Sequence, residues 1–352
     1  MSTDNQPDIT SSVSTVAGSH ELKQLLGIDR AKASLIAELQ EALKITSRGA
    51  LFAEGGLCSG YMVEPMADNY FIAQEFSVSR NDLRAALTQA LAELDVAPIC
   101  ADDSLWSGHI LCKIGALIQC TPFGVYQLSV SQNRNVYLEL GMAIGLGRPF
   151  ILVKDREATV SPMFEGFEYY SINSYIQLRY EFGDKVRPYL AGIVKYVRPK
   201  LPVAGSARTV VIAHGELDSI DFCVPIARTI ARHNLIPVIL GDPNGKISFY
   251  LEREKIIHQI VGNAGRIQLE ETLSAIQSAR FGVYRVEKVC APDTFLALGI
   301  SIGLGRPGFL THLADHDTPA DVKGLSALNF TSYSDLERSF TVTYEHLLTT
   351  YI

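Results

Sequence analysis

One carboxylate of this chain lies inside an otherwise apolar stretch. The stretch is 135–149, NVYLELGMAIGLGRP, and its acidic residue is Glu139. Burying a lone carboxylate costs several kcal/mol unless a partner compensates for the lost water. A carboxylate kept there could stabilise or attack an electron-poor sugar carbon, as in glycosidic bond cleavage. The structural alternative is that Glu139 stabilises the fold through hydrogen bonds to loop amides or to Arg148.

The residues around Glu139 predict the element that positions it. Because nearly every residue is apolar or glycine, the stretch should form a helix buried on most sides. Asn135 is the expected N-cap, since its side-chain oxygen can accept from the first free amides. Gly147 is the expected left-handed stop, and Pro149 prevents the helix from continuing. A strand is predicted directly afterwards, over 150–153.

Two short motifs of this region occur twice at one spacing. The tetrapeptide FGVY at 123–126 returns at 281–284, and GLGRP at 145–149 returns at 303–307. Both offsets are 158 residues, from 281 − 123 and from 303 − 145. Such a repeat predicts two similar domains in tandem.

Strand and helix patterns alternate through both copies. In the first copy, strands are predicted over 70–73, 98–101, 123–128, 150–153 and 168–172, with helices over 81–94, 108–118, 135–147 and 184–196. In the second copy, strands are predicted over 209–213, 236–240, 281–286, 307–311 and 328–330, with helices over 219–233, 269–279, 293–304 and 333–348. Alternation of this kind predicts an α/β fold, a doubly wound parallel sheet covered on both faces, in each copy.

The composition sets the remaining domain boundaries. Residues 1–19 are rich in Ser, Thr and Asp and are predicted to be a disordered tail. Residues 20–68 should form a helical extension followed by an irregular segment. The first α/β domain is assigned to 69–198 and the second to 208–352, with a linker at 199–207.

Charge and hydropathy exclude several classes of function. The chain has 47% hydrophobic residues, 20% charged residues and a net charge of −7, without a basic stripe, so we expect no nucleic-acid partner. It lacks an apolar run of about eighteen residues and a basic, apolar leader, so we expect a cytoplasmic protein without a membrane partner. The cysteines show no metal-ligand spacing and are expected to be free, buried thiols: Cys58, Cys100, Cys112, Cys120, Cys223 and Cys290.

Ligands of doubly wound sheets bind beyond the carboxyl ends of the strands, at the point where the strand order reverses. With the order 2-1-3-4-5, the first and third strands are neighbours and Glu139 faces the loop after the first strand. Asp102 or Asp103 could hold sugar hydroxyls, and Phe76 or Trp106 could stack on a base. The candidate binding residues are Gln74, Phe76, Ser77, Asp102, Asp103, Gln127 and Asn135, near Glu75 and Ser129.

Four segments resemble the nucleoside 2-deoxyribosyltransferase-like proteins and the neighbouring TIR-like nucleotide-binding proteins. They are FIAQEFS at 71–77, ADD at 101–103, GHI at 108–110 and NVYLELG at 135–141. The resemblance covers about residues 70–155 and, more weakly, 209–311, and the ELGxAxGLGRP pattern is its most specific part.

The resemblance implies a flavodoxin-like sheet in each copy and a catalytic glutamate on the helix after the third strand, which is Glu139 here. It implies cleavage or transfer at the N-glycosidic bond of a nucleoside or nucleotide, NAD among them, and more loosely a role in bacterial anti-phage defence. We expect a small-molecule partner, a homo-oligomer, no cofactor and no metal. Two departures put turnover in doubt, because Gln127 replaces the family's Asp and the second copy has Ala297 in place of Glu139.

Non-catalytic interpretations follow from the same residues. Because Ala297 replaces the glutamate and the loop after the first strand reads His214-Gly215-Glu216, the second copy is expected to serve packing, dimerisation or ligand sensing. The whole chain could be a nucleotide-binding sensor or assembly module, or a structural protein whose repeated helices form a homodimer. Asp102 and Asp103 could simply form a turn, Trp106 could pack in a core, and His109 could cap a helix.

Overall fold

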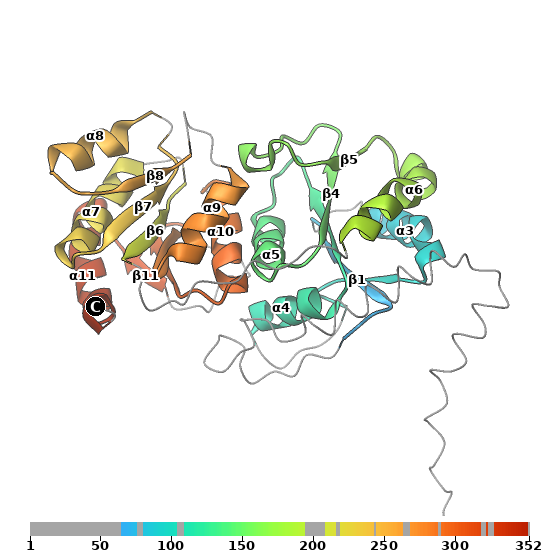
Figure 1. Ribbon diagram of the computed structural model, residues 1–352, viewed down its shortest axis with the longest axis horizontal. Helices are drawn as coiled ribbons and strands as arrows, with labels where there is room; N and C mark the ends of the chain where they lie inside the picture. The colour runs from blue at the N-terminus through green and yellow to red at the C-terminus, as the bar shows by residue number, and fades with distance from the viewer. Residues whose placement is uncertain are drawn as a thin grey trace, which may run out of the picture.

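The computed structural model describes residues 65–75, 80–103, 109–193, 208–215, 219–242, 244–262, 268–287, 290–317, 322 and 327–350, and the side chains of 191–193 and 344–350 are not considered. Several predicted features lie outside these ranges: the extension over 20–46, the linker, Phe76, Ser77, Trp106 and Glu216. Two parallel sheets with helices on their faces lie side by side along the long axis (Figure 1). The predicted tandem α/β fold is therefore confirmed.

The first unit holds a five-stranded parallel sheet in the order β2-β1-β3-β4-β5, as predicted. The strands are β1 (Asn69–Ala73), β2 (Ala97–Ile99), β3 (Gly124–Leu128), β4 (Phe150–Asp155) and β5 (Tyr169–Ile172). The helices are α3 (Arg80–Ala90), α4 (Ile110–Cys120), α5 (Arg134–Gly145) and α6 (Tyr175–Ile193), with short 3-10 turns at Ala92–Leu94 and Pro162–Phe164. Helix α6 begins nine residues before the predicted start at 184.

The second unit has a six-stranded parallel sheet in the order β11-β10-β9-β6-β7-β8. The strands are β6 (Thr209–Ala213), β7 (Ile236–Leu240), β8 (Gln259–Val261), β9 (Phe281–Arg285), β10 (Gly308–Leu313) and β11 (Ala327–Phe330). The helices are α7 (Ser219–Arg232), α8 (Lys246–Arg253), α9 (Leu269–Ser278), α10 (Pro292–Gly303) and α11 (Tyr333–Thr350). Five of these strands repeat the order of the first sheet, and β8 extends it at one edge.

An insertion in the second unit accounts for the extra strand. The first strands of the two sheets start at 69 and 209, an offset of 140, whereas α5 and α10 start at 134 and 292, an offset of 158. The difference, 158 − 140 = 18 residues, falls between β7 and α9, where α8 and β8 lie. Neither element was predicted from the sequence, because each is short.

Helices α5 and α10 pack directly against each other and join the two units (Figure 1). A Cβ atom at Gly141 would lie 2.2 Å from the carbonyl oxygen of Leu296, and one at Gly299 would lie 2.1 Å from that of Leu138. These contacts are reciprocal, since 299 − 141 and 296 − 138 both equal 158. A Cβ at Gly141 would also lie 3.0 Å from the Cα of Gly299, and one at Gly145 would lie 2.9 Å from the Cα of Gly303, so the two helices run parallel. The reciprocal contacts relate them by a pseudo-twofold axis.

One hydrophobic core spans this junction. It contains Leu138 and Met142 from α5 together with Leu296 and Ile300 from α10. Two further cores lie on the outer faces of the sheets, one beneath α3 and α6 and the other beneath α7 and α11. The repeated apolar helices thus bury their faces within a single chain, so these faces are not available for a homodimer.

The repeated motifs have the same structural roles in both copies. The ring of Tyr126 lies over Gly124, where a Cβ would come within 2.6 Å of it, and Tyr284 lies over Gly282 in the same way. Gly147 and its counterpart adopt the left-handed conformation predicted for a helix stop, with φ of 64° at Gly147.

The arginine of each GLGRP motif ties the helix before the third strand to the motif. Arg148 donates from Nη2 to the carbonyl oxygen of Gln119 at the end of α4. Arg306 donates in the same way to the carbonyl oxygen of Gln277 near the end of α9, at 2.5 Å. GLGRP is therefore a structural motif, as the sequence suggested.

Two expectations about single residues are wrong. The N-cap of α5 is Asn133, whose side-chain oxygen accepts from the amide of Asn135 at 3.0 Å, so Asn135 lies inside the helix. Cys112 is disulfide-bonded and so is not a free thiol. The predicted free, buried state is confirmed for Cys100, Cys120, Cys223 and Cys290.

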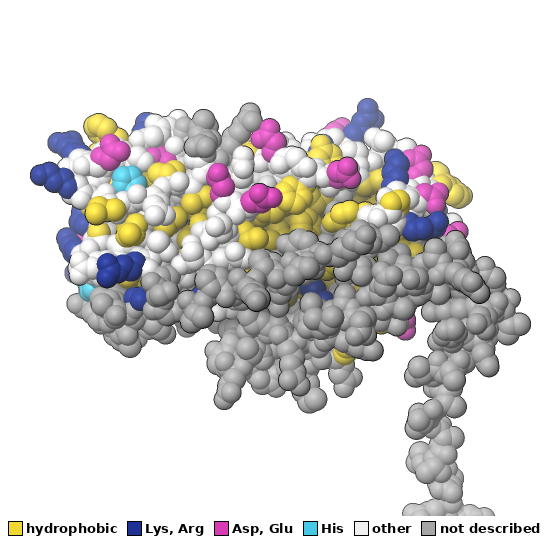
Figure 2. Space-filling model, viewed as in Figure 1, with side chains coloured by type: hydrophobic (Ala, Val, Ile, Leu, Met, Phe, Trp, Pro, Cys, Tyr) yellow, Lys and Arg dark blue, Asp and Glu magenta, His cyan; other side chains and the backbone are white. Residues whose placement is uncertain are grey.

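None of the helices in the described ranges combines the length and apolar character needed to cross a membrane. On the face in Figure 2, lysine and arginine side chains are scattered among acidic and hydrophobic ones, and the described residues form no continuous basic area there.

Candidate functional site

The candidate site lies at the carboxyl edge of the first sheet, where β1 and β3 are neighbours. Gln74 follows β1 directly and is 8% exposed. Among the described residues, neither its amide oxygen nor its amide nitrogen has a hydrogen-bond partner. An unpaired buried amide is costly, so Gln74 is the residue of this edge best suited to pair with a ligand.

Gln127, near the end of β3, is already bonded at both ends of its amide. Its nitrogen donates to Asp155 at 2.9 Å, and its oxygen accepts from the backbone amide of Glu75 at 3.3 Å. These bonds join the loop after β1 to the end of β4. Gln127 therefore shapes the edge, and it could contact a ligand only by exchanging one of these bonds.

Asp102 and Asp103 lie beyond the end of β2 and face arginines of α3. Asp102 forms an ion pair with Arg80. Asp103 accepts from both terminal nitrogens of Arg84, at 2.6 and 2.7 Å, and from the backbone amide of Cys100 at 2.7 Å. Burial alone would raise the pKa of Asp103, but the bonds from Arg84 and the amide outweigh it and lower that pKa.

These pairs also bear on whether this corner could hold a metal ion. Cys100, Asp102 and Asp103 offer ligand atoms within 4.8 Å of one another. Their carboxylates are neutralised by two guanidinium groups, and burial raises the pKa of the Cys100 thiol to about 11. The chemistry of the corner therefore suits a structural link between β2 and α3.

Glu139 is on the second turn of α5 and is 9% exposed. Its charge acts on Tyr126 of β3, whose pKa is raised first by burial and then by Glu139. Helix α5 packs against β1 and β3, and Glu139 is close enough to Tyr126 for its charge to act on that residue. Its counterpart Ala297 is fully buried in α10. The second unit therefore packs the equivalent helix with alanine at this place.

The second unit has different chemistry at the same edge. Arg285 corresponds to Gln127 by the 158-residue offset, and it forms a fully buried ion pair with Glu287 through contacts of 3.0 and 2.8 Å. Glu287 also accepts from the amide of Leu313 at 2.9 Å and is 2.7 Å from Nδ1 of His316. Burial would raise the pKa of Glu287, but these bonds lower it.

His214 follows β6 directly and contacts two backbone carbonyl oxygens, those of Gly215 and, at 2.9 Å, Gly241. Burial and the charge of Arg285 lower its pKa. It connects the ends of β6 and β7. His109 of the first unit is the N-cap of α4 and accepts from the amide of Leu111 at 3.2 Å, as expected for a capping residue.

Some partners at these edges were not found from the sequence. The ion pairs of Arg80 and Arg84 with two consecutive aspartates could have been predicted, because the two arginines are spaced i, i+4 and so lie on one face of the helix. No sequence pattern indicates the hydrogen bond from Arg134 to the carbonyl oxygen of Cys290, which crosses the junction with a length of 2.9 Å. It links the first residue of α5 to the loop after β9.

No family model matches the chain, and no curated protein matches it. Among solved structures, one match is a ketoreductase domain from the bacillaene assembly line, with 7% identity, a TM-score of 0.23, and coverage of 83% of this chain and 79% of that one. Another is PlmKR1, the ketoreductase from the first module of phoslactomycin biosynthesis in Streptomyces sp. HK803, with 13% identity, a TM-score of 0.17, and coverage of 80% and 88%. Similarity this low supports no argument about function.

Proposed function

We propose that the first unit binds a nucleoside or nucleotide, NAD among them, and cleaves its N-glycosidic bond by hydrolysis or transfer. Glu139 is the proposed catalytic residue. The observation that carries the proposal is the buried carboxylate of Glu139 on α5. The second unit forms the equivalent helix with alanine at this position. A buried carboxylate that the equivalent helix of the other unit lacks is a candidate for chemistry.

Two features of the sheet support this assignment. The order β2-β1-β3-β4-β5 makes β1 and β3 neighbours, which is the point where ligands bind in such sheets. The buried amide of Gln74, without a partner among the described residues, offers one acceptor and two donors at that point.

The proposed reaction has two steps. The Glu139 carboxylate attacks C1′ of the sugar while the C1′–N bond breaks, and the base leaves with the bonding electrons. The base of a neutral nucleoside then takes up a proton, whereas the positively charged nicotinamide of NAD leaves as a neutral molecule without one. Water or a second base then attacks C1′ and releases Glu139, so the configuration at C1′ is retained overall. The same carboxylate could instead stabilise a positively charged sugar without forming a bond to it.

The test is loss of base release in Glu139→Gln and Glu139→Ala. Purified protein is incubated with NAD and a nucleoside mixture, and the products are separated by chromatography. We expect both variants to fold, because alanine is accommodated in α10, and to lose activity by on the order of 10³-fold or more. Glu271→Gln, at an exposed position of α9, is the control and should keep full activity. Undiminished turnover in either Glu139 variant would exclude Glu139 from the mechanism.

A second candidate function is a nucleotide sensor without catalysis. It is favoured by the bonds that already occupy Gln127, Asp102 and Asp103, the residues expected to hold the sugar. Calorimetry against a nucleotide panel separates the two functions. Binding without any product in mass spectra supports the sensor, and binding followed by base release supports the enzyme. The predicted homo-oligomer and the anti-phage role stay predictions of the sequence.

A further inference from the structure

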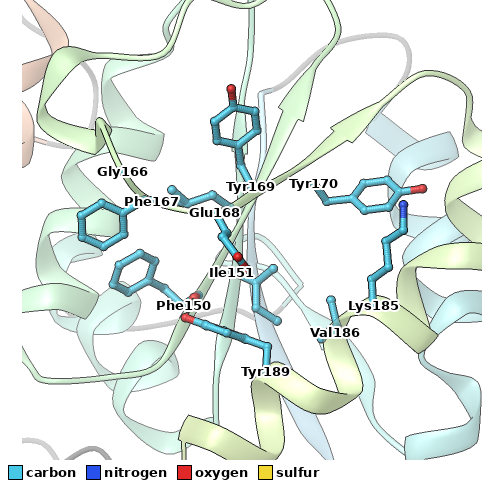
Figure 3. Close-up of a pocket in the computed structure, with 11 residues that line it drawn as sticks. Phe150, Ile151, Gly166, Phe167, Glu168, Tyr169, Tyr170, Lys185, Val186 and Tyr189 are labelled. Carbon is cyan, nitrogen blue, oxygen red and sulfur yellow. Dashed lines mark hydrogen bonds between the residues drawn. The ribbon is translucent and has the colours of Figure 1, made fainter.

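A pocket of about 810 Å³ lies at the opposite end of the first sheet from Glu139. It is formed by the first residues of β4 and β5 and by the second half of α6, so it opens at the amino ends of the strands (Figure 3). This volume is within the range of ligand pockets in proteins, about 300–1,000 Å³. The pocket is therefore separate from the site of the proposed function and independent of it.

Five of its eleven lining residues are aromatic. The rings of Phe150 and Phe167 are stacked, with centroids 6.1 Å apart. Tyr169 and Tyr189 are 44% and 43% exposed, which is high for such large side chains. Tyr189 also donates its hydroxyl to the carbonyl oxygen of Phe150 at 2.7 Å, which fixes its ring beside that strand (Figure 3).

The tyrosine rings here already attract cations. The side chains of Lys185 and Tyr170 lie next to each other (Figure 3), and the Lys185 ammonium group is 5.1 Å from the centroid of the Tyr170 ring. The ammonium group of Lys154 is 5.6 Å from the centroid of the Tyr169 ring. The faces of aromatic rings carry partial negative charge, so they bind cations with little desolvation of the ring. Rings arranged around a pocket are a recognised way to hold quaternary ammonium groups.

The charged residues of the lining favour the same sign of ligand. Lys185 is already paired with Glu181 at 3.3 Å. Glu168 also lines the pocket, and within the described part of the chain its carboxylate has no hydrogen bond or ion pair. The unpaired charge of the lining is therefore negative.

We propose that this pocket binds an organic cation with an apolar body, such as an aromatic quaternary ammonium compound. Its positive head lies among the aromatic rings near Glu168, and its apolar part fills the space between β4 and α6. The site is distinct from the carboxyl edge, and the proposal stands whether or not the first unit cleaves nucleotides.

The experiment is isothermal titration calorimetry of the full chain with benzyltrimethylammonium, benzyl alcohol and benzenesulfonate. The three probes share a ring and differ in charge. We expect the cation to bind at least about fivefold more tightly than the neutral and anionic probes, given the usual size of cation–π attraction. Equal binding of all three, or preference for the sulfonate, would overturn the proposal, as would no binding of the cation at millimolar concentration.

Variants locate the site. Glu168→Gln and Phe167→Leu should each weaken binding of the cation about threefold or more, and Lys185→Met should strengthen it because a like charge is removed. Glu157→Gln and Tyr180→Leu, exposed positions outside the pocket, are the matched controls for charge and ring and should leave binding unchanged. A Glu168→Gln variant that binds as the parent does, together with weaker binding by Lys185→Met, would contradict a cation site. Circular dichroism of each variant checks that the fold is intact.

Discussion

At the scale of single residues, His214 couples stability to pH. Its ring is 6% exposed, and burial together with Arg285 lowers its pKa below the ordinary value of about 6.5. The contacts with the carbonyl oxygens of Gly215 and Gly241, and the charge of Asp242, act in the opposite direction. The native state therefore resists protonation that the unfolded chain accepts.

This lowered pKa predicts a loss of stability in mild acid. As pH falls below about 6.5, the unfolded state takes up a proton at His214 and the native state does not, so the free energy of unfolding falls. The slope from this one group is at most about 1.4 kcal/mol per pH unit. Urea unfolding between pH 7.5 and 5.5 measures it, and His214→Asn should reduce the slope. His233→Asn, at a partly exposed position, should not; equal slopes in parent and His214→Asn would contradict the prediction.

Residue-scale predictions from sequence succeeded where the signal was local. Gly147 needed only its place after an apolar run to be recognised as a left-handed helix stop. Asn135 was wrongly predicted to be the cap because Asn133, two residues earlier, is the same residue type, and the sequence does not choose between them; the Asn133 side chain accepts from the amide of Asn135. The hydrogen bonds of Gln127 could not be predicted, because its partners Glu75 and Asp155 come from the ends of two other strands.

At the scale of elements, the contact between α5 and α10 depends on glycine. With a Cβ at Gly141 or Gly299, a carbonyl oxygen of the other helix would lie 2.2 or 2.1 Å away, so the helices must separate. Separation opens the core that both units share, which loses apolar burial and close packing.

Gly141→Ala and Gly299→Ala should therefore each destabilise the chain by about 1–3 kcal/mol or more. Because both substitutions act on one interface, the double variant should cost less than the sum of the two. Chemical denaturation of the two single variants and the double variant measures this. Full additivity, or no loss in either single variant, would argue against a close reciprocal contact.

Several strands and helices could be predicted from the sequence to within one residue at each end. Strands β6 and β9 and helices α7 and α10 matched their predicted ranges closely, because each is an apolar or amphipathic run bounded by polar or glycine residues. Helix α8 and strand β8 were not predicted because each is short; in the structure α8 packs against α7 and β8 pairs with β7.

At the scale of the whole molecule, the two units are not independent folding units. The central core contains residues of α4 and α5 from one unit and α9 and α10 from the other. Unfolding either unit would expose the face of the other, at roughly 25 cal/mol for each Å² of apolar surface. The described parts of both units should therefore unfold together.

A single transition is the expected result in calorimetry, with equal calorimetric and van't Hoff enthalpies. In native-state hydrogen exchange, peptides from α5 and α10 should open with the same free energy and the same dependence on denaturant. Two separated transitions, with α10 opening at lower denaturant than α5, would contradict a shared core.

The reciprocal helix contact has a consequence for how this chain can change over evolutionary time. Each half carries one side of a matched surface, so a half exchanged by recombination with a distant relative would arrive without its fitted counterpart. The glycines of α5 are constrained by the backbone of α10, and those of α10 by the backbone of α5. Inheritance of the duplicated halves as one gene keeps the two surfaces matched, while residues outside the contact, such as Glu139 and Ala297, are left to diverge.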